Sequence, residues 1–325
     1  VDGWMGDDWF HHGAFRAINL PYIHDQVATR KNSEHWWTSN GDDYAQYLKG
    51  GSAGDLARAH GLEQIGFWQK LVAHPAYDTF WQEQAIDRLL AREPLTVPML
   101  LVHGLWDQED IYGALAVYRA LKPKDTGNDK VFLAIGPWYH GQEIDDGTHL
   151  GRIRFPSDTS YDFQKDVLLP FLDHYLKDDA PALTVSPVTA YETGTNTWRH
   201  LKTWPSASGD RTPVMTPVYL RADGKLGFSA PGAAEGADSY VSDPSKPVPY
   251  RSRPINPVDP PKGMSVGQPW HEWLTEDQRN ISTRTDVLSY VTPVLDAPVQ
   301  IAGAPMVHLM ASTTGTDADW VVKLI

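Results

Sequence analysis

The sequence predicts an α/β domain followed by an all-β domain. Two short apolar runs, residues 95–102 and 131–135, have the length and composition of strands that are covered on both faces. An amphipathic segment between them, residues 111–121, predicts a helix and therefore a βαβ unit with parallel strands. From about residue 181 onward, short apolar runs separated by Gly, Pro, Asp and Ser predict a β-sandwich or jelly roll.

The composition excludes several classes of function. The chain has 325 residues, enough for two domains, and a formal net charge of −13, which disfavours nucleic acid or an anionic membrane as a partner. Because there is no cysteine, the chain has no disulfide, thiolate metal site or cysteine nucleophile. No apolar run is long enough to predict a membrane-spanning helix.

Both ends of the sequence suggest a piece of a longer chain. The sequence begins Val1-Asp2-Gly3 without an initiator Met, and its last residues, 320–325, resemble the middle of a strand. We therefore expect further sequence on either side, and the missing signal peptide carries no information.

The remaining elements follow from the same patterns. Residues 33–95 predict helices, and residues 162–177 predict an amphipathic helix kinked at Pro170. Its expected inward residues are Phe163, Val167, Phe171 and Tyr175. Residues 244–269 are rich in proline and predict a coil on the surface. The expected strands of the second domain are 217–221, 239–242, 287–291, 299–302 and 307–311.

An acid and a histidine follow the two predicted parallel strands. Asp107 lies in HGLWDQED directly after the first strand, and His140 lies in GPWYHG directly after the second. The carboxyl ends of parallel strands carry ligands and catalytic groups, and an acid followed by a histidine is the order of a Ser…Asp…His triad. The alternative is an Asp that caps the following helix and a histidine in a surface loop.

One serine matches the nucleophile motif G-x-S-x-G. Ser52 lies in GGSAG, but the preceding residues 42–49 are polar with a helical period, whereas a nucleophile elbow follows a strand. We interpret Ser52 as part of a Gly-rich loop that ends a helix. The nucleophile is then expected upstream of Val1.

Three further carboxylates are candidates for binding a cation. Asp8 follows Asp7 near the N-terminus, and Glu109 and Asp110 come directly after the candidate triad acid. Carboxylates that converge would raise each other's pKa, and a substrate ammonium would relieve the repulsion. Alternatively, Glu109 and Asp110 are ordinary acids at a helix N-terminus, and Asp7-Asp8 is a turn.

No cofactor or metal is expected. Adjacent His11 and His12 do not share one face of a helix or strand, and Asp145-Asp146-Gly147 lacks the ligand register of a calcium loop. There is also no Gly-rich phosphate loop.

The sequence resembles the α-amino acid ester hydrolases, serine hydrolases grouped with cocaine esterase, glutaryl acylases and X-Pro dipeptidyl peptidases. The segments that carry the resemblance are GWMGDDWFHHGAFR (3–16), LLVHGLWDQEDIYGA (100–114) and GPWYHGQ (136–142). GTNTWRHLKTWP (194–205) and DADWVVKLI (317–325) are similar to the β-domain of the wider group. The Asp-Gln-Glu-Asp form at 107–110 resembles the ester hydrolase branch in particular.

The resemblance implies a fold and a site. The fold is an α/β-hydrolase domain over residues 1–180, with a helical cap at about 20–90, followed by a jelly roll over 181–325. Asp107 matches the triad acid and His140 the base, while Asp8, Glu109 and Asp110 match the carboxylates that bind the substrate's α-ammonium. The family's serine elbow and oxyanion-hole tyrosines would lie before Val1.

The resemblance also implies a reaction, a cellular location and an oligomeric state. The substrates are α-amino acid esters and amides, and the acyl group passes through a serine ester to water or to the amine of a β-lactam nucleus. Members are typically exported homotetramers, so a periplasmic or secreted homotetramer is expected. Two alternatives stay open, an X-Pro dipeptidyl aminopeptidase and a non-catalytic protein whose jelly roll binds a ligand.

Overall fold

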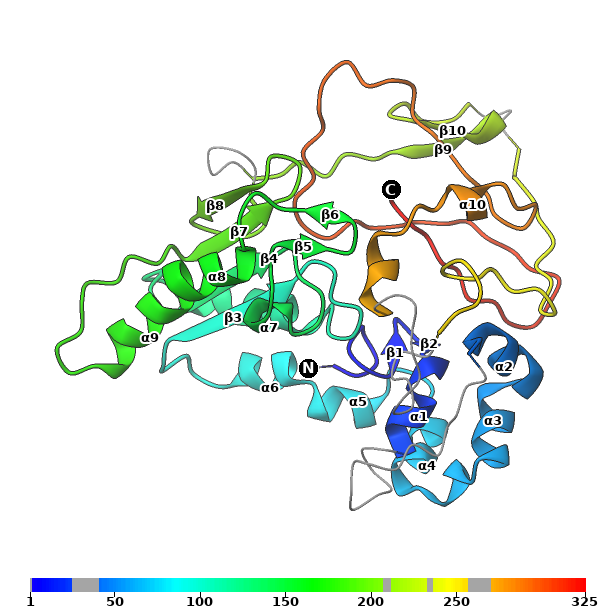
Figure 1. Cartoon of the computed structure of the whole chain (residues 1–325), viewed down its shortest axis with the longest axis horizontal. Coiled ribbons are helices and arrows are strands. Elements are labelled where there is room, and N and C mark those ends of the chain that lie inside the picture. The colour runs from blue at the N-terminus through cyan, green and yellow to red at the C-terminus, as the bar shows by residue number, and fades with distance from the viewer. Residues whose placement is uncertain (1, 25–40, 207–211, 233–235, 257–269) are drawn as a thin grey trace.

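A four-stranded sheet forms the centre of the computed structural model, which describes residues 2–24, 41–206, 212–232, 236–256 and 270–325. Its strands are β3 (Met99–Gly104), β4 (Val131–Gly136), β7 (Val188–Glu192) and β8 (Thr197–Leu201), in the order β3-β4-β7-β8. The first three are parallel, and β8 runs antiparallel to β7 (Figure 1). The parallel pair predicted from the sequence is confirmed.

The first strand starts later than the sequence predicts. Residues 95–98 are coil, and pairing begins where the backbone N–H of Met99 donates to the carbonyl of Lys130. Pro98 has no N–H to contribute to a ladder, so the apolar run becomes a strand only after it.

Helices cover both faces of this sheet. On one face, α7 (Gly113–Leu121) packs Val117 and Leu121 against the odd-numbered residues of β4. On the other face, Phe163 and Phe171 pack against the even-numbered residues of β4. Every residue of β4 is buried. Successive side chains of a strand point to opposite faces, so β4 contributes to the apolar layers on both faces of the sheet.

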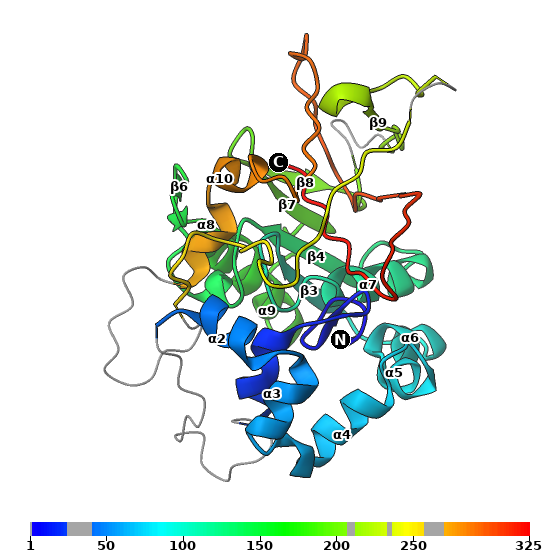
Figure 2. The ribbon, with the colours of Figure 1, turned by 90° about the vertical axis from the view of Figure 1, so that its right-hand side faces the viewer.

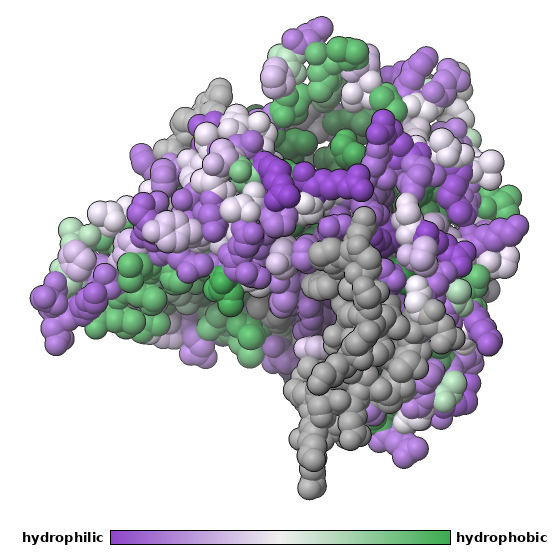
Figure 3. Space-filling view, in the orientation of Figure 1, coloured by the Kyte–Doolittle hydropathy of each residue, from purple (hydrophilic) through white to green (hydrophobic). Residues whose placement is uncertain are grey.

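The helix predicted at 162–177 is three consecutive segments: α8 (Thr159–Phe163), a π-helical stretch (Gln164–Leu168) and α9 (Leu169–Leu176). It begins earlier than predicted because the side chain of Asp158 accepts the N–H groups of Ser160 and Tyr161. The π-helical stretch immediately precedes Pro170, which lacks an N–H for an ordinary helical bond. Exposed apolar side chains gather over α9 (Figure 3), at Leu169, Leu172 and Leu176.

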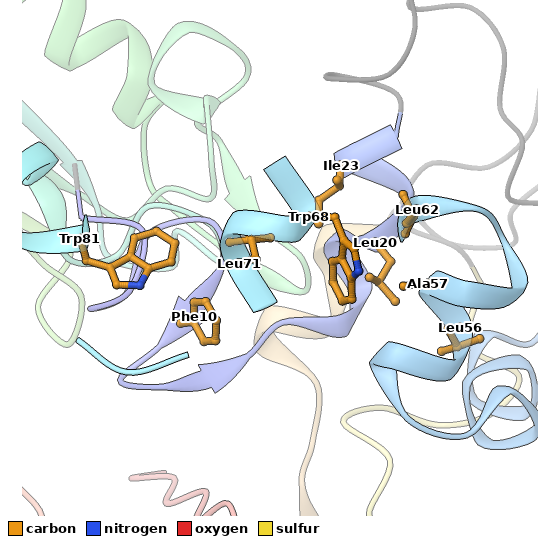
Figure 4. Close-up of a cluster of buried hydrophobic side chains, with 9 residues drawn as sticks. All are labelled: Phe10, Leu20, Ile23, Leu56, Ala57, Leu62, Trp68, Leu71 and Trp81. Atoms are coloured by element: carbon orange, nitrogen blue, oxygen red, sulfur yellow. The ribbon is translucent and has the colours of Figure 1, made fainter. Parts of the chain in front are cut away.

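The regular elements in the described part of the predicted cap are all helices, joined by short turns and coil. Its elements are α1 (Leu20–Ile23), α2 (Asp43–Gly50), α3 (Ala53–Ala59), α4 (Gly66–Ala73), α5 (Thr79–Gln84) and α6 (Ile86–Arg92). Residues 25–40 lie outside the described residues. The helices share an apolar core with the N-terminal hairpin of β1 (Phe10–His11) and β2 (Ala14–Phe15). Figure 4 shows this core, in which Trp68 and Trp81 are buried with Phe10.

The C-terminal half contains few paired strands. β9 (Tyr219–Arg221) pairs with β10 (Lys225–Gly227), close to the strand expected at 217–221, and Val291 makes a single bridge to Lys225. The runs expected as strands at 239–242, 299–302 and 307–311 are unpaired coil in the structure. Val241 is 82% exposed and Met310 94% exposed, so these runs lack the apolar second layer that holds a sandwich strand.

A proline-rich coil and several short elements complete the described structure. Residues 244–256 are coil and turn, as expected, whereas the rest of the predicted coil at 244–269 lies outside the described residues. Short elements are β5 (His149–Leu150), β6 (Ile153–Arg154) and α10 (Arg279–Ser282).

Strands β7 and β8 lie beyond residue 180 yet complete the α/β sheet, so the domain boundary at 180 stays a prediction. Within the described ranges, no helix has both the length and the hydropathy to cross a membrane.

Candidate active site

The ends of β3 and β4 are held close together. The backbone N–H of Leu105 donates to the carbonyl of Gly136, and that of Trp106 donates to the carbonyl of Trp138. A Cβ at Gly104 would lie 2.7 Å from the Trp138 carbonyl oxygen, and one at Gly136 would lie 2.3 Å from the Trp138 ring. Glycine therefore permits the close approach of the two loops that carry Asp107 and His140.

Asp107 and His140 form the hydrogen-bonded pair that the sequence predicts. Nδ1 of His140 lies 3.1 Å from Oδ2 and 3.3 Å from Oδ1 of Asp107. Because an ionised carboxylate only accepts hydrogen bonds, Nδ1 carries the proton of this pair. The remaining nitrogen, Nε2, is the one that can exchange a proton with a substrate or a serine.

Asp107 is held by backbone donors as well as by the histidine. Its Oδ1 accepts the N–H groups of Glu109 and Asp110, both at 2.8 Å. Burial by itself would raise the pKa of Asp107, but the hydrogen bonds from His140 and from these two N–H groups lower it below its usual value. The acid therefore stays ionised and holds the imidazole in one orientation.

His140 faces two more carboxylates. Its Nε2 lies 3.9 Å from Oε2 of Glu109, and its Nδ1 lies 3.7 Å from Oδ2 of Asp110. The hydrogen bond to Asp107 is the main cause that raises the pKa of His140 to about 9, and the charges of Asp107, Glu109 and Asp110 add to it. Without a ligand, the imidazole is therefore protonated at neutral pH.

The N-terminal segment brings Asp8 to the same place. The backbone N–H of Asp8 donates to the carbonyl of Glu109 at 3.1 Å, and Asp7 forms an antiparallel bridge with Asp110. Both views of the ribbon show this segment beside α7 and β3 (Figures 1 and 2). The structure thus gathers all five predicted site residues: Asp8, Asp107, Glu109, Asp110 and His140.

Burial and the neighbouring carboxylates raise the pKa values of Asp8, Glu109 and Asp110. Burial raises the pKa of Asp110 to about 6, with additional contributions from Asp8, Asp107 and Asp7. Burial likewise raises the pKa of Glu109 and of Asp8, and the charge of Asp8 adds to the shift at Glu109. Burial is the main cause of these shifts and the neighbouring carboxylates add to it, so a cation bound here would favour the ionised acids.

Two cationic groups face these acids within the described part of the chain. They are the imidazolium of His140 and the guanidinium of Arg16, which is near Glu109, Asp8, Asp110 and Asp107. Five carboxylates, counting Asp7, therefore share two positive charges. The site has a surplus of negative charge that a ligand cation would neutralise.

A cavity of about 390 Å³ opens beside this pair. Asp107, Asp110 and His140 line one part of it, and residues 100–104 of β3 line another. Because β3 is the edge of the described sheet, this second part of the cavity runs along the unpaired side of the strand.

Ser52 takes no part in this site. Its side chain begins α3, where Oγ accepts the N–H of Asp55 at 3.1 Å, and the carboxylate of Asp55 accepts the N–H of Ser52 in return. Gly51, with φ of +81°, ends α2 immediately before it. The interpretation of GGSAG as a loop between helices is confirmed.

No group of three or more His, Cys, Asp or Glu side chains in the described parts is arranged to hold a metal ion.

Sequence reasoning assigned no role to Arg16 or Gln142, although both lie in quoted motifs. Nη1 of Arg16 donates to the carbonyl of Asp8 at 3.0 Å. Gln142 is 1% exposed; its Oε1 accepts the N–H of Tyr139, and its Nε2 donates to the carbonyls of Asp146 and His149. In the sequence, each is a polar residue at the end of a quoted motif. That position was the signal from which a supporting role could have been predicted.

Two family models match the chain. The X-Pro dipeptidyl-peptidase (S15 family) model matches residues 1–142, and the model of the X-Pro dipeptidyl-peptidase C-terminal non-catalytic domain matches residues 184–325. Cocaine esterase from Rhodococcus sp. (strain MB1 Bresler) is 28% identical over 267 residues, which cover 79% of this chain and 42% of the esterase. The second model covers the part that the sequence predicts to be all-β.

Solved structures resemble most of the chain. An aminopeptidase from a marine sediment archaeon, Thaumarchaeota archaeon, has a TM-score of 0.81 and 51% identity, and the match covers 89% of this chain and 45% of the aminopeptidase. An α-amino acid ester hydrolase has a TM-score of 0.86 and 47% identity, with 93% of this chain and 48% of the hydrolase covered. The chain spans about half the length of these structures. The matches therefore show an α/β-hydrolase-type fold followed by the C-terminal domain of this group, and the two models together assign the chain's domains to the X-Pro dipeptidyl-peptidase (S15) family.

Proposed function

We propose that this chain supplies the acid, the base and the ammonium-binding carboxylates of a serine hydrolase that acts on α-amino acid esters and amides. The observation that carries the proposal is the position of Glu109 and Asp110 against the base, 3.9 Å and 3.7 Å from the ring nitrogens of His140. An ester whose carbonyl is attacked beside this base places its α-amino group within reach of the acids. α-Amino β-lactam antibiotics present the same amine next to an acyl group and belong to the proposed substrates.

The proposed reaction is acyl transfer in two steps. His140 accepts the proton of a serine hydroxyl from another segment of the polypeptide, and the serine oxygen forms a bond to the substrate carbonyl carbon. The bond to the leaving alcohol or amine breaks, and that group takes the proton from His140. Water, or the amine of a β-lactam nucleus, then bonds to the acyl carbon while His140 takes its proton; the bond to the serine oxygen breaks, and the serine receives that proton. Asp107 stabilises the imidazolium in both steps.

The carboxylates are proposed to confer specificity for a free amine. An N-acylated substrate has no positive charge to pair with Glu109 and Asp110, and the partly buried acids keep their mutual repulsion. Free amino esters are therefore preferred.

The test compares phenylglycine methyl ester with its N-acetyl derivative in the full-length enzyme. We expect kcat/KM to be far larger for the free amine, and Glu109→Gln to reduce this preference by raising KM for the free amine alone. Glu83→Gln, at an exposed position on α5, is the matched control and should preserve the preference. Equal rates with the two esters would refute the role of the carboxylates.

An X-Pro dipeptidyl aminopeptidase is the second candidate. The S15 model and the archaeal aminopeptidase favour it, and such a peptidase also recognises a free amine. A Xaa-Pro anilide and phenylglycine methyl ester separate the two, because an ester hydrolase prefers the second by a large factor and a peptidase the first.

A third candidate, from a different class, is a non-catalytic protein whose jelly roll binds a ligand. The hydrogen-bonded pair of Asp107 and His140 favours an enzyme. If His140→Ala left every measurable function unchanged, the binding protein would become the better account.

The cellular location, the oligomeric state and the partners are proposed from the resemblance. We propose an exported homotetramer with small-molecule partners, and with neither nucleic acid nor membrane as a ligand. Light scattering of the full-length protein and fractionation of its host cells test the assembly and the export.

A further inference from the structure

Asp7 differs from the other acids of the site because its side chain is fully buried and accepts hydrogen bonds from backbone N–H groups. The residue is 0% exposed. Its Oδ2 accepts the N–H of Asp2 at 3.0 Å, and its Oδ1 accepts the N–H groups of Tyr112 and Gly113 at 2.9 and 3.1 Å. Burying a carboxylate is costly unless strong donors compensate, and three backbone N–H groups provide such compensation.

Two of these donors form the beginning of α7. Tyr112 is the N-cap residue of that helix and has no side-chain capping bond of its own. The orphan N–H groups and the positive end of the helix dipole favour a carboxylate at this position. Asp7 therefore caps a helix from a segment more than a hundred residues away in sequence.

The same link places the backbone of Asp8 beside the loop of Glu109 and Asp110. Asp8 directly follows Asp7 and adopts φ of +59°, a left-handed conformation that is uncommon outside glycine. Its N–H bonds to the carbonyl of Glu109, and its own carbonyl accepts from Arg16 and Asn19. Holding Asp8 in this conformation requires that the surrounding contacts determine its position.

We propose that Asp7 is the positioning residue of the carboxylate cluster, tying the segment that carries Asp8 to the loop that carries Glu109 and Asp110. This inference rests on the proposed recognition of an α-ammonium. Asp7 does not touch the substrate; it sets the geometry in which Asp8 and the acids of the loop meet one amine.

The test uses Asp7→Asn in the full-length enzyme. Asparagine has one acceptor oxygen and an NH₂ group that cannot accept, so it cannot satisfy the N–H of Asp2 together with those of Tyr112 and Gly113, and the tie to α7 is weakened. The substrates are phenylglycine methyl ester and phenylacetic acid methyl ester, which lacks only the amine. We expect the ratio of kcat/KM values, amino ester over des-amino ester, to fall about tenfold to a hundredfold, mainly through KM of the amino ester.

Asp125→Asn is the matched control. Asp125 is also buried and also accepts three backbone N–H groups, those of Asp129, Lys130 and Val131, but it lies at the opposite end of β4. This variant should lower the melting temperature and leave the substrate ratio at the wild-type value.

A second variant guards against misfolding. In Asp7→Ala no side-chain oxygen is left to accept from Tyr112 and Gly113, so the tie to α7 is lost and the same fall in the ratio is expected. A ratio that stays at the wild-type value in folded Asp7→Ala overturns the inference, as does an equal loss for both esters in either variant. A wild-type enzyme that does not distinguish the esters contradicts the proposed function itself.

Discussion

The carboxylate of Asp107 lies 3.1 Å from Nδ1 of His140, although the two residues belong to loops that follow separate strands. Strands β3 and β4 are parallel and in register from Met99 opposite Val131 to Gly104 opposite Gly136, so their carboxyl ends coincide. Close approach at the two glycines then brings the acid and the histidine within hydrogen-bond reach. The geometry of the pair therefore follows from strand register and from the absence of a Cβ at two positions.

Replacing Asp107 tests its role toward the imidazole. In Asp107→Asn we expect kcat to fall about ten-thousandfold, as in other triads, because an amide no longer selects the productive tautomer. The pKa of His140 should fall from its raised value near 9, since its main cause is the hydrogen bond to Asp107. Steady-state kinetics and NMR titration of the His140 ring measure the two effects.

The control for this change is Asp78→Asn. Asp78 accepts a bond from Nδ1 of His74 at 2.7 Å, in a part of the cap outside the cavity. This variant should keep kcat near the wild-type value. Equal losses in the two variants would mean that the Asp107–His140 bond has only a structural role.

Substrate binding should shift the pH dependence of catalysis. His140 faces the carboxylates of Asp107, Glu109 and Asp110, and the charge of Asp8 is also near it. A bound ammonium neutralises part of this charge, so the imidazolium is less stable in the complex and its pKa is lower. Because the base acts when neutral, activity rises with pH through this pKa.

Two substrates measure this shift. With phenylglycine methyl ester, the rising limb of the kcat profile should lie at lower pH than with phenylacetic acid methyl ester, which has no amine. The second ester serves as the control, because it leaves the acids unneutralised. Coincident limbs would contradict the electrostatic coupling between the acids and His140.

Gln142 should stabilise the loop that carries His140. Gln142→Ala leaves the N–H of Tyr139 and the carbonyls of Asp146 and His149 without their side-chain partner, at a cost of about 1–3 kcal/mol for each group left buried and unpaired. Denaturant unfolding should therefore show a large loss of stability. Gln84→Ala is the control, because its bond to the carbonyl of Phe80 is exposed, and we expect a change within about 0.5 kcal/mol.

Gly136→Ala tests the close packing between the strand ends. The new Cβ would meet the ring of Trp138, a fully buried side chain, so the strand end or the ring must move. We expect a loss of about 1–3 kcal/mol together with lower activity, because the shift displaces the loop of His140. Gly66→Ala, at the start of α4 with nothing within 4 Å of the new Cβ, should be neutral or stabilising. Similar effects at both glycines would contradict this packing argument.

Much of the site could be predicted from the sequence, because it depends on elements that follow one another closely along the chain. The apolar runs fix β3 and β4, and the parallel arrangement places the residues after them at one edge of the sheet. The residues alone left two interpretations of Asp8 open, a cation-binding acid or part of a turn, and the resemblance favoured the first. The approach of Asp8 depends on Asp7, whose bonds to Tyr112 and Gly113 join segments that no local pattern connects.

The second half was harder to predict for a physical reason. A strand forms only when a partner supplies a ladder and an apolar layer, and a short apolar run specifies neither. Residues 219–221 pair because β10 follows after a short turn, whereas 299–302 and 307–311 are coil. β7 joined the α/β sheet because Val188 and Ala190 supply the apolar face that packs with Val117 on α7.

Labelling with a fluorophosphonate tests the central claim most directly. The full-length protein and its His140→Ala variant are treated with the reagent, and the modified peptide is mapped by mass spectrometry. We predict a label on one serine other than Ser52 in the wild-type protein, and labelling that is strongly slowed in the variant. A label on Ser52, no label on the wild-type protein, or equal labelling of both proteins would contradict the assignment of Asp107 and His140 to a serine hydrolase.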